Sequence, residues 1–113
     1  MHEYSIVQAL LERVDAEADR RGATAVHRIS IRIGELSGVD ASLLQTAYTI
    51  VRNRTRCAAA ALDIAAVAAV WQCPACKRAI GAGDFLRCTE CARAAELVAG
   101  GEILLDRIEM EVP

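Results

Sequence analysis

Two C-x-x-C pairs constrain the fold of this sequence more than any other feature, because each pair brings two thiolates together on one tight turn. The cysteines of these pairs are Cys73, Cys76, Cys88 and Cys91. Eleven residues separate the first pair from the second. Four sulfurs in a tetrahedron are a ligand set that structural zinc accepts. The segment from Trp71 to Cys91 is therefore predicted to fold around one structural Zn(2+) ion.

Iron in a rubredoxin-type site is the nearest alternative metal, but the two pairs lie closer together than we expect for that fold. Neither pair has a glycine directly after its second cysteine, since Lys77 and Ala92 occupy those positions. This departure concerns the geometry of the turns and leaves the ligands in place. The fifth cysteine, Cys57, is far from both pairs in the sequence, and we interpret it as a small hydrophobe that binds no metal.

The composition fits one small domain with a modest core. The chain has 113 residues, of which 54% are hydrophobic and 4% aromatic, so aliphatic side chains must fill the interior. A formal net charge of -2 argues against a strongly nucleic-acid-binding surface. The start Met1-His2-Glu3 lacks the basic region of a secretory signal, and no apolar run reaches the length of a membrane span. We expect a soluble cytoplasmic protein with reduced cysteines.

The first predicted helix covers residues 4–21. Its apolar residues recur every three or four positions among charged residues, which is the pattern of an amphipathic helix. These apolar residues are Val7, Leu10, Leu11, Val14 and Ala18. Ser5 is a candidate cap and Gly22 a stop signal. Residues 1–3 are then expected to form a short free end that precedes the helix and contributes nothing to the core.

A second helix is predicted from the N-cap Asp40 to about Arg54. Two further arginines, Arg52 and Arg56, flank its predicted end. Because cations at the end of a helix interact favourably with its dipole, we interpret the three arginines as a solvated helix terminus rather than a binding patch.

Residues 26–34 have the alternating pattern of a half-buried strand, with isoleucines on one side and arginines or serine on the other. His27 falls on the isoleucine side. We expect it to be a partly buried, hydrogen-bonded residue rather than a metal ligand.

Residues 103–112 are predicted as a strand, since their apolar side chains alternate with charged ones. Residues 61–71 are alanine-rich, which by propensity suits a helix, but Leu62 and Ile64 alternate around Asp63 and the run ends at the first cysteine pair, so this segment is also predicted as a strand. The cysteine pairs lie between these two strands. The predicted fold class is therefore mixed α/β, with two helices packed on a small mixed β-sheet and an inserted four-cysteine zinc-ribbon lobe. Residues 1–70 and 96–113 are expected to form the α/β domain, and residues 71–95 the zinc-binding lobe.

Taken in order, four features of the chain resemble one protein family. They are the start Met1-His2-Glu3, the strand and turn from Ile31 to Val39, the two C-x-x-C pairs and the closing strand. Together they look like the HypA/HybF family of hydrogenase nickel-incorporation proteins, which are zinc-containing nickel metallochaperones. The likeness covers essentially the whole chain, and its most specific marks are His2 and the paired cysteines.

The resemblance implies a transferable Ni(2+) ion bound at His2, with Glu3 beside it, and a separate structural Zn(2+) held by the four cysteines. It also implies a nickel-handling GTPase partner and delivery of nickel to the precursor of the [NiFe] hydrogenase large subunit during hydrogenase maturation. A histidine in second position suits this chemistry. It offers Ni(II) its imidazole, the terminal amine of Met1 and nearby backbone amides, and such nitrogens can lie in one plane.

Two other functions compete with that of a nickel carrier. A zinc-ribbon module that binds nucleic acid or protein is suggested by basic residues near the cysteines, but acidic residues oppose them and no aromatic platform accompanies them. The basic residues are Lys77, Arg78, Arg87 and Arg93, and the acidic ones are Asp84 and Glu90. A metalloenzyme is disfavoured because four thiolates leave zinc no open position for water or substrate. We therefore expect no enzyme activity.

Overall fold

The computed structural model describes residues 2–81, 83 and 85–113, and the chain divides into two compact units. The first unit comprises Met1–Arg32, Val39–Ala65 and Leu104–Pro113. The second comprises Ile33–Gly38 and Ala66–Ile103, and it contains all four paired cysteines. Within the described residues, no helix combines the length and the apolar character needed to cross a bilayer.

Helix α1, His2–Arg21, begins two residues earlier than its apolar pattern predicts. Its buried side chains are Glu3, Val7, Leu11, Val14 and Ala18. Glu3 lies one turn before Val7 on the same stripe, so it belongs to the buried face of the helix. The expectation of a free end at residues 1–3 is therefore wrong for His2 and Glu3.

The two ends of α1 differ in how well the sequence predicts them. Ser5 is not a cap, because its hydroxyl lies inside the helix and donates to the carbonyl of His2 at 2.9 Å. Gly22 is confirmed as the stop, since its φ of 65° is left-handed and the helix does not continue past it. Met1 lies outside the described residues.

Helix α2, Ala41–Val51, begins as predicted and ends early. Asp40 is confirmed as its N-cap, because the Asp40 carboxylate accepts a hydrogen bond from the backbone N–H of Leu43 at 3.0 Å. This bond and one from Ser42 hold the pKa of Asp40 below its usual value. The predicted extension to Arg54 is wrong, since Arg54 has a left-handed φ of 66°.

Two of the three arginines that follow α2 are half-buried, so the interpretation as a solvated helix terminus is wrong for them. Arg52 donates to the carbonyl of Ala60 at 3.0 Å, and its guanidinium carbon lies 5.6 Å from the ring centre of Tyr48. Arg56 forms an ion pair with Asp19 of α1. Arg52 therefore joins the end of α2 to Ala60, and Arg56 joins the segment that follows α2 to α1.

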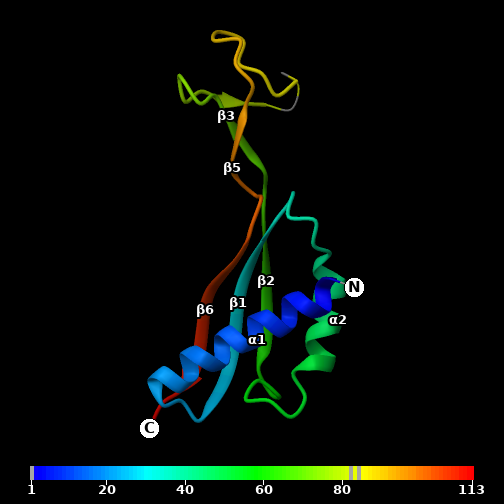
Figure 1. Ribbon diagram of the computed structural model, residues 1–113, viewed down its shortest axis with the longest axis vertical. Helices are drawn as coiled ribbons and strands as arrows, with labels where there is room; N and C mark the ends of the chain where they lie inside the picture. Colours follow the sequence, from blue (N-terminus) through cyan, green and yellow to red (C-terminus); the bar gives the residue numbers. More distant parts are fainter. Residues whose placement is uncertain (1, 82, 84) are drawn as a thin grey trace. The chain divides into compact units, whose positions relative to one another are not determined.

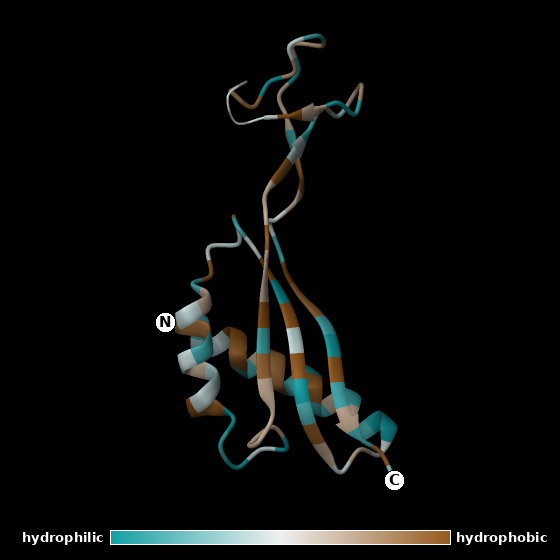
Figure 2. Ribbon diagram, turned by 180° about the vertical axis from the view of Figure 1, so that it is seen from behind, coloured by the Kyte–Doolittle hydropathy of each residue, from teal (hydrophilic) through white to brown (hydrophobic). Residues whose placement is uncertain are grey.

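A three-stranded sheet packs beneath the helices, in the order β2-β1-β6. Its strands are β1 (Ala25–Gly34), β2 (Ala61–Val67) and β6 (Ile103–Glu111). β6 runs antiparallel to β1, because Thr24 donates to the carbonyl of Glu111 at one end of the pair. At the other end Gly34 donates to the carbonyl of Glu102. β2 runs in the same direction as β1, and both helices cover one face of the sheet (Figure 1; Figure 2). The predicted fold class is confirmed.

Ion pairs cover the opposite face of this sheet, and Figure 2 shows the alternation of hydrophilic and hydrophobic residues along the strands. Arg28 lies 2.5 Å from Asp63 of β2 and 3.2 Å from Glu109 of β6. Arg32 lies 2.9 Å from Asp106 of β6. The central strand is thus joined to both of its neighbours by charge as well as by backbone hydrogen bonds.

His27 does not lie on the isoleucine side of β1, so that expectation is wrong. The strand has two successive exposed residues, His27 and Arg28, which interrupt the alternation. The His27 side chain is 61% exposed and pairs with Glu111 at 3.4 Å. His27 is therefore a surface residue whose ion-pair partner is Glu111.

The predicted strand over residues 61–71 is broken into β2 and β3 (Val70–Gln72). The break coincides with a close approach of Gly100, because a Cβ on this glycine would lie 2.6 Å from the Cα of Ala69. Gly100 also has a left-handed φ of +89°. Any side chain at position 100 would collide with the backbone of Ala69, so glycine is required there.

A second small sheet, in the order β4-β3-β5, adjoins the cysteine pairs. β3 pairs antiparallel with β4 (Ala79–Ile80) and with β5 (Glu96–Ala99). The strands immediately precede or follow the cysteine turns, so the sheet anchors both of them within the second unit.

Candidate metal centres

The first cysteine pair sits on a turn, residues 73–78, which we call the first knuckle. The backbone N–H of Cys73 donates to the carbonyl of Arg78 at 2.9 Å, and the N–H of Lys77 donates to the carbonyl of Cys73 at 3.0 Å. These two bonds close the turn and bring the sulfurs of the pair to one side.

The second knuckle, residues 88–93, repeats this pattern. Cys88 donates to the carbonyl of Arg93 at 2.9 Å, and Ala92 donates to the carbonyl of Cys88 at 2.9 Å. Lys77 and Ala92 occupy the same place in their knuckles and have left-handed φ values of 66° and 55°. This is the conformation in which a glycine is the usual residue, and both side chains adopt it at a cost of about 1–2 kcal/mol.

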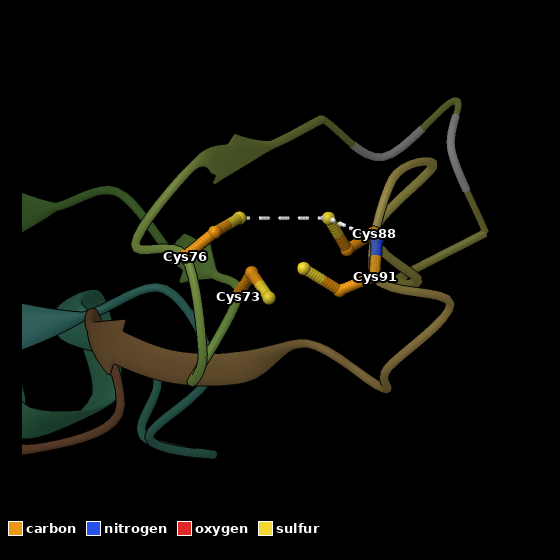
Figure 3. A group of neighbouring side chains, drawn as sticks. All are labelled: Cys73, Cys76, Cys88 and Cys91. Atoms are coloured by element: carbon orange, nitrogen blue, oxygen red, sulfur yellow. Dashed lines mark hydrogen bonds between the residues drawn. The ribbon is translucent and has the colours of Figure 1, made fainter.

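The four sulfurs of the two knuckles all lie within 4.8 Å of one another, and Figure 3 shows them converging on one point. Sγ of Cys76 and Sγ of Cys88 are 3.7 Å apart. A tetrahedral site with zinc–sulfur bonds of about 2.3 Å requires sulfurs about 3.8 Å apart. The arrangement therefore fits a single tetrahedral metal ion.

The pKa values of the Cys73 and Cys91 thiols are shifted in opposite directions. Hydrogen bonds from the backbone amides of Cys76 and Ala75 lower the pKa of Cys73 to about 6. Contacts with the sulfurs of Cys76 and Cys73 raise the pKa of Cys91 to about 12. Neighbouring sulfurs cannot all carry charge together unless a cation offsets their repulsion. The donor set thus has the chemistry of a site that binds a divalent ion and releases protons as it does so.

An apolar shell surrounds the sulfurs. Cys73 and Cys88 are buried together with Ile80, and Trp71 and Ala95 pack against this cluster. Trp71 comes from β3 and Ile80 from β4, so the small sheet supplies the shell. Such packing limits access of water to the two buried sulfurs, which is typical of a structural site rather than a catalytic one.

A second group of candidate ligands lies at the start of α1. The imidazole of His2 is 59% exposed, whereas the carboxylate of Glu3 is buried. Nδ1 of His2 lies 3.8 Å from Oε2 of Glu3. The same oxygen lies 3.5 Å from the backbone nitrogen of Asp40, immediately before α2. An accessible imidazole therefore stands beside a carboxylate that the protein holds in place.

Sequence reasoning missed this contact between Glu3 and the amide of Asp40. A signal was nevertheless present, because extending the apolar stripe back by one turn from Val7 reaches Glu3. No comparable signal in the sequence points to Asp40 as the neighbour.

Cys57 belongs to neither group of candidate ligands. It is buried, and burial raises the pKa of its thiol. Within the described part of the chain, the cluster of potential metal ligands contains the four paired cysteines and not Cys57 or His27.

Two of the four basic residues near the cysteines, Arg78 and Arg87, form contacts within the lobe. Arg78 pairs with Glu90 at 3.0 Å, which connects the two knuckles. Arg87 donates to the carbonyl of Ala92 at 2.7 Å. Asp84, which was expected to oppose these charges, lies outside the described residues. Two of the four basic side chains thus hold the lobe together.

Comparison with known proteins identifies the family. A model of the family described as "Hydrogenase/urease nickel incorporation, metallochaperone, hypA" matches residues 1–110. The chain belongs to the HypA family. This match confirms the predicted family. Membership places the chain among the nickel metallochaperones of hydrogenase maturation.

Similar members of the HypA family cover nearly the whole chain. The hydrogenase maturation factor HypA of Wolinella succinogenes is 38% identical over 114 residues, which are 98% of this chain and 96% of that protein. The corresponding factor of Shewanella baltica is 37% identical over 113 residues, which are 98% of this chain and 97% of that protein. The solution structure of the Ni metallochaperone HypA from Helicobacter pylori matches with a TM-score of 0.76 and 28% identity, over 98% of both chains.

Proposed function

We propose that this HypA-family chain carries Ni(2+) at its N-terminus as cargo and holds Zn(2+) at its four paired cysteines as a structural ion. The zinc ligands in this proposal are Cys73, Cys76, Cys88 and Cys91. The convergence of four sulfurs, two of them buried, supports zinc. Four thiolates complete the coordination of the ion, so its role is to hold the two knuckles together.

The observation that carries the proposal for nickel is the exposed imidazole of His2 beside the buried carboxylate of Glu3. We propose that nickel takes the His2 imidazole, the terminal amine of Met1 and backbone nitrogen, with Glu3 contributing charge or an oxygen. Nitrogen ligands in a plane suit Ni(II), while soft thiolates suit zinc. The type of ligand therefore directs nickel to the N-terminus and zinc to the cysteines.

Accessibility makes the N-terminus suitable for transfer. A ligand set that includes the exposed imidazole of His2 can be displaced stepwise by a partner, whereas the site with the buried sulfurs of Cys73 and Cys88 releases its ion only when the lobe opens. We propose that nickel passes, with the help of a nickel-handling GTPase, to the precursor of the hydrogenase large subunit. We assign this process to the cytoplasm, where thiols stay reduced. The chain itself needs no catalytic activity for this role.

Metal analysis of the protein with an authentic, untagged N-terminus tests the proposal. After equilibrium dialysis against Ni(2+), we expect about one zinc and one nickel per chain, and a mild chelator should remove the nickel first. Nickel that enters only as zinc leaves would show that the cysteines bind both metals and would contradict the proposal. Tight, salt-dependent binding to DNA or RNA would instead favour a zinc-ribbon module.

A further inference from the structure

A groove of about 470 Å³ lies between the C-terminal half of α1 and strand β6, within the first unit. Leu105, Ile108 and Met110 line it, and each of these side chains is half-buried. α1 crosses the sheet at an angle (Figure 1), and the apolar side chains of β6 at the groove keep part of their surface exposed. The groove therefore offers an apolar floor that is open to a ligand.

The strand beside this groove is an edge strand. β6 pairs with β1 on one side, and no strand of the described residues pairs with its other side. It is nine residues long. An open edge of this kind presents unpaired N–H and C=O groups, to which an extended peptide can add as a further strand.

Charges at the rim of the groove indicate the chemistry of such a peptide. Glu17 is paired with Arg21, and Asp106 is paired with Arg32 on the outer face of the sheet. Arg13 and Arg107 line the groove and are both exposed. The ion pairs of the described residues at this groove join Glu17 to Arg20 and Arg21 and Asp106 to Arg32, while Arg13 acts on Glu17 only through a weaker, longer-range attraction. The two charges at the groove that lack an ion pair at contact distance among the described residues are therefore positive, although the whole chain carries a formal charge of -2.

We propose that this groove is a docking site for an extended acidic peptide of a partner protein, which adds to the edge of β6. An apolar side chain of the peptide enters the groove against Ile108 and Met110. Carboxylates at other positions of the peptide pair with Arg13 and Arg107, and the one that meets Arg13 lies two residues from the apolar side chain, on the same face of the added strand. The site lies on the same helix that carries His2 and Glu3 at its other end, so a docked partner contacts the helix that begins with the proposed nickel ligands.

Nuclear magnetic resonance with the full-length, zinc-loaded protein tests this proposal. The probe is a nine-residue peptide with valine at its centre and glutamate at the other positions, so that carboxylates lie on both faces of the added strand, and the control is the same peptide with lysine in place of glutamate. Amide shifts on addition of the acidic peptide should concentrate on β6 and on the C-terminal half of α1. Two exposed ion pairs should make the acidic peptide bind about tenfold more tightly than the basic one.

A charge-reversal variant, Arg13→Glu with Arg107→Glu, should switch this preference toward the basic peptide. Arg54→Glu with Arg93→Glu is the matched control, because it changes the net charge equally at two exposed residues that do not line the groove. Its preference should stay acidic. Should the reversal variant lose its native spectrum, Arg13→Gln with Arg107→Gln should abolish the preference without reversing it.

Three results would overturn the proposal. The first is shifts that avoid β6, or no shifts at all at millimolar peptide. The second is equal binding of both peptides. The third is a dimer in sedimentation velocity that the Arg13→Glu, Arg107→Glu variant dissociates, since a second copy of the chain would then occupy the groove.

Discussion

The two candidate metal centres differ in how their donor groups are held and in how far they are buried. In the knuckles, four like donors are held by matching backbone hydrogen bonds, and two of the sulfurs are buried. At the N-terminus, one buried carboxylate stands beside an exposed imidazole. The first arrangement favours retention of an ion and the second favours exchange. If the proposed assignment holds, burial of the donors distinguishes the structural ion from the cargo ion as much as their chemical type does.

Loss of one knuckle cysteine should have the largest effect, because a structural zinc contributes about 10–16 kcal/mol of apparent binding free energy. Cys73→Ala and Cys91→Ala should each lose zinc and the ordered structure of the lobe. Hydrogen exchange should accelerate at the amides of residues 71–93, while the first unit keeps most of its protection.

Cys57→Ala is the control for this experiment, since Cys57 is buried outside the cluster. It should retain zinc. Unchanged exchange in the lobe after loss of a knuckle cysteine would refute the structural role of zinc.

Glu3→Gln should weaken nickel binding about tenfold, because it removes a negative charge near the proposed site while preserving the size of the side chain. The variant can still accept a hydrogen bond from the amide of Asp40, so the thermal midpoint should change little. Glu12→Gln, on an exposed position of the same helix, is the matched control. Titration of Ni(2+) by calorimetry measures both. Equal affinities would mean that the Glu3 side chain has no part in the site.

Tyr48→Phe should lower the free energy of unfolding of the first unit by about 1 kcal/mol and leave zinc bound. The buried Tyr48 hydroxyl donates to the carbonyl of Ala60 at 2.8 Å. Burial raises the pKa of Tyr48 to about 12, compared with about 10 in an unfolded chain. A raised pKa stabilises the folded state below about pH 10, and this contribution is lost as the pH rises to about 12.

Denaturant unfolding between about pH 9 and pH 12 checks this prediction, and the variant should show a smaller alkaline loss of stability. An identical alkaline profile in both proteins would assign the loss to another buried acid, such as the thiol of Cys57, whose pKa burial also raises.

Ala92→Gly should have the smallest effect and strengthen the knuckles. Its left-handed φ of 55° strains any side chain, so glycine should increase zinc affinity about two- to fivefold. Ala75→Gly, within the first knuckle but without a left-handed φ, is the control and should not strengthen zinc binding. Competition with a chromophoric chelator measures both. A gain in the control equal to that in Ala92→Gly would remove the strain explanation.

The two centres also differ in how far the sequence predicts them. The grouping of the knuckle cysteines follows from their spacing, since a C-x-x-C turn is a local structure. Local patterns could not foretell that Lys77 and Ala92 adopt left-handed conformations, because neither is a glycine. The domain limits at residues 70 and 96 stay a prediction about how the chain folds.

Long-range contacts account for the remaining differences. The helix that was predicted to begin at Tyr4 begins at His2. In its first turn, the carboxylate of Glu3 accepts a hydrogen bond from the backbone amide of Asp40, which lies far away in the sequence. The strand over residues 61–71 breaks where Gly100 passes close to Ala69. Periodicity reports the existence of an element, whereas its ends depend on neighbours that lie far away in the sequence.

The central claim, that nickel binds at the chain end and zinc at the cysteines, is tested most directly by nickel titration of three proteins with zinc measured in parallel. They are the untagged chain, His2→Ala, and a chain with a few residues added before Met1. We predict that His2→Ala abolishes tight nickel binding, that the extension impairs it because the terminal amine becomes an amide, and that all three keep one zinc. Tight nickel binding by His2→Ala, or loss of zinc along with nickel, would contradict two independent sites.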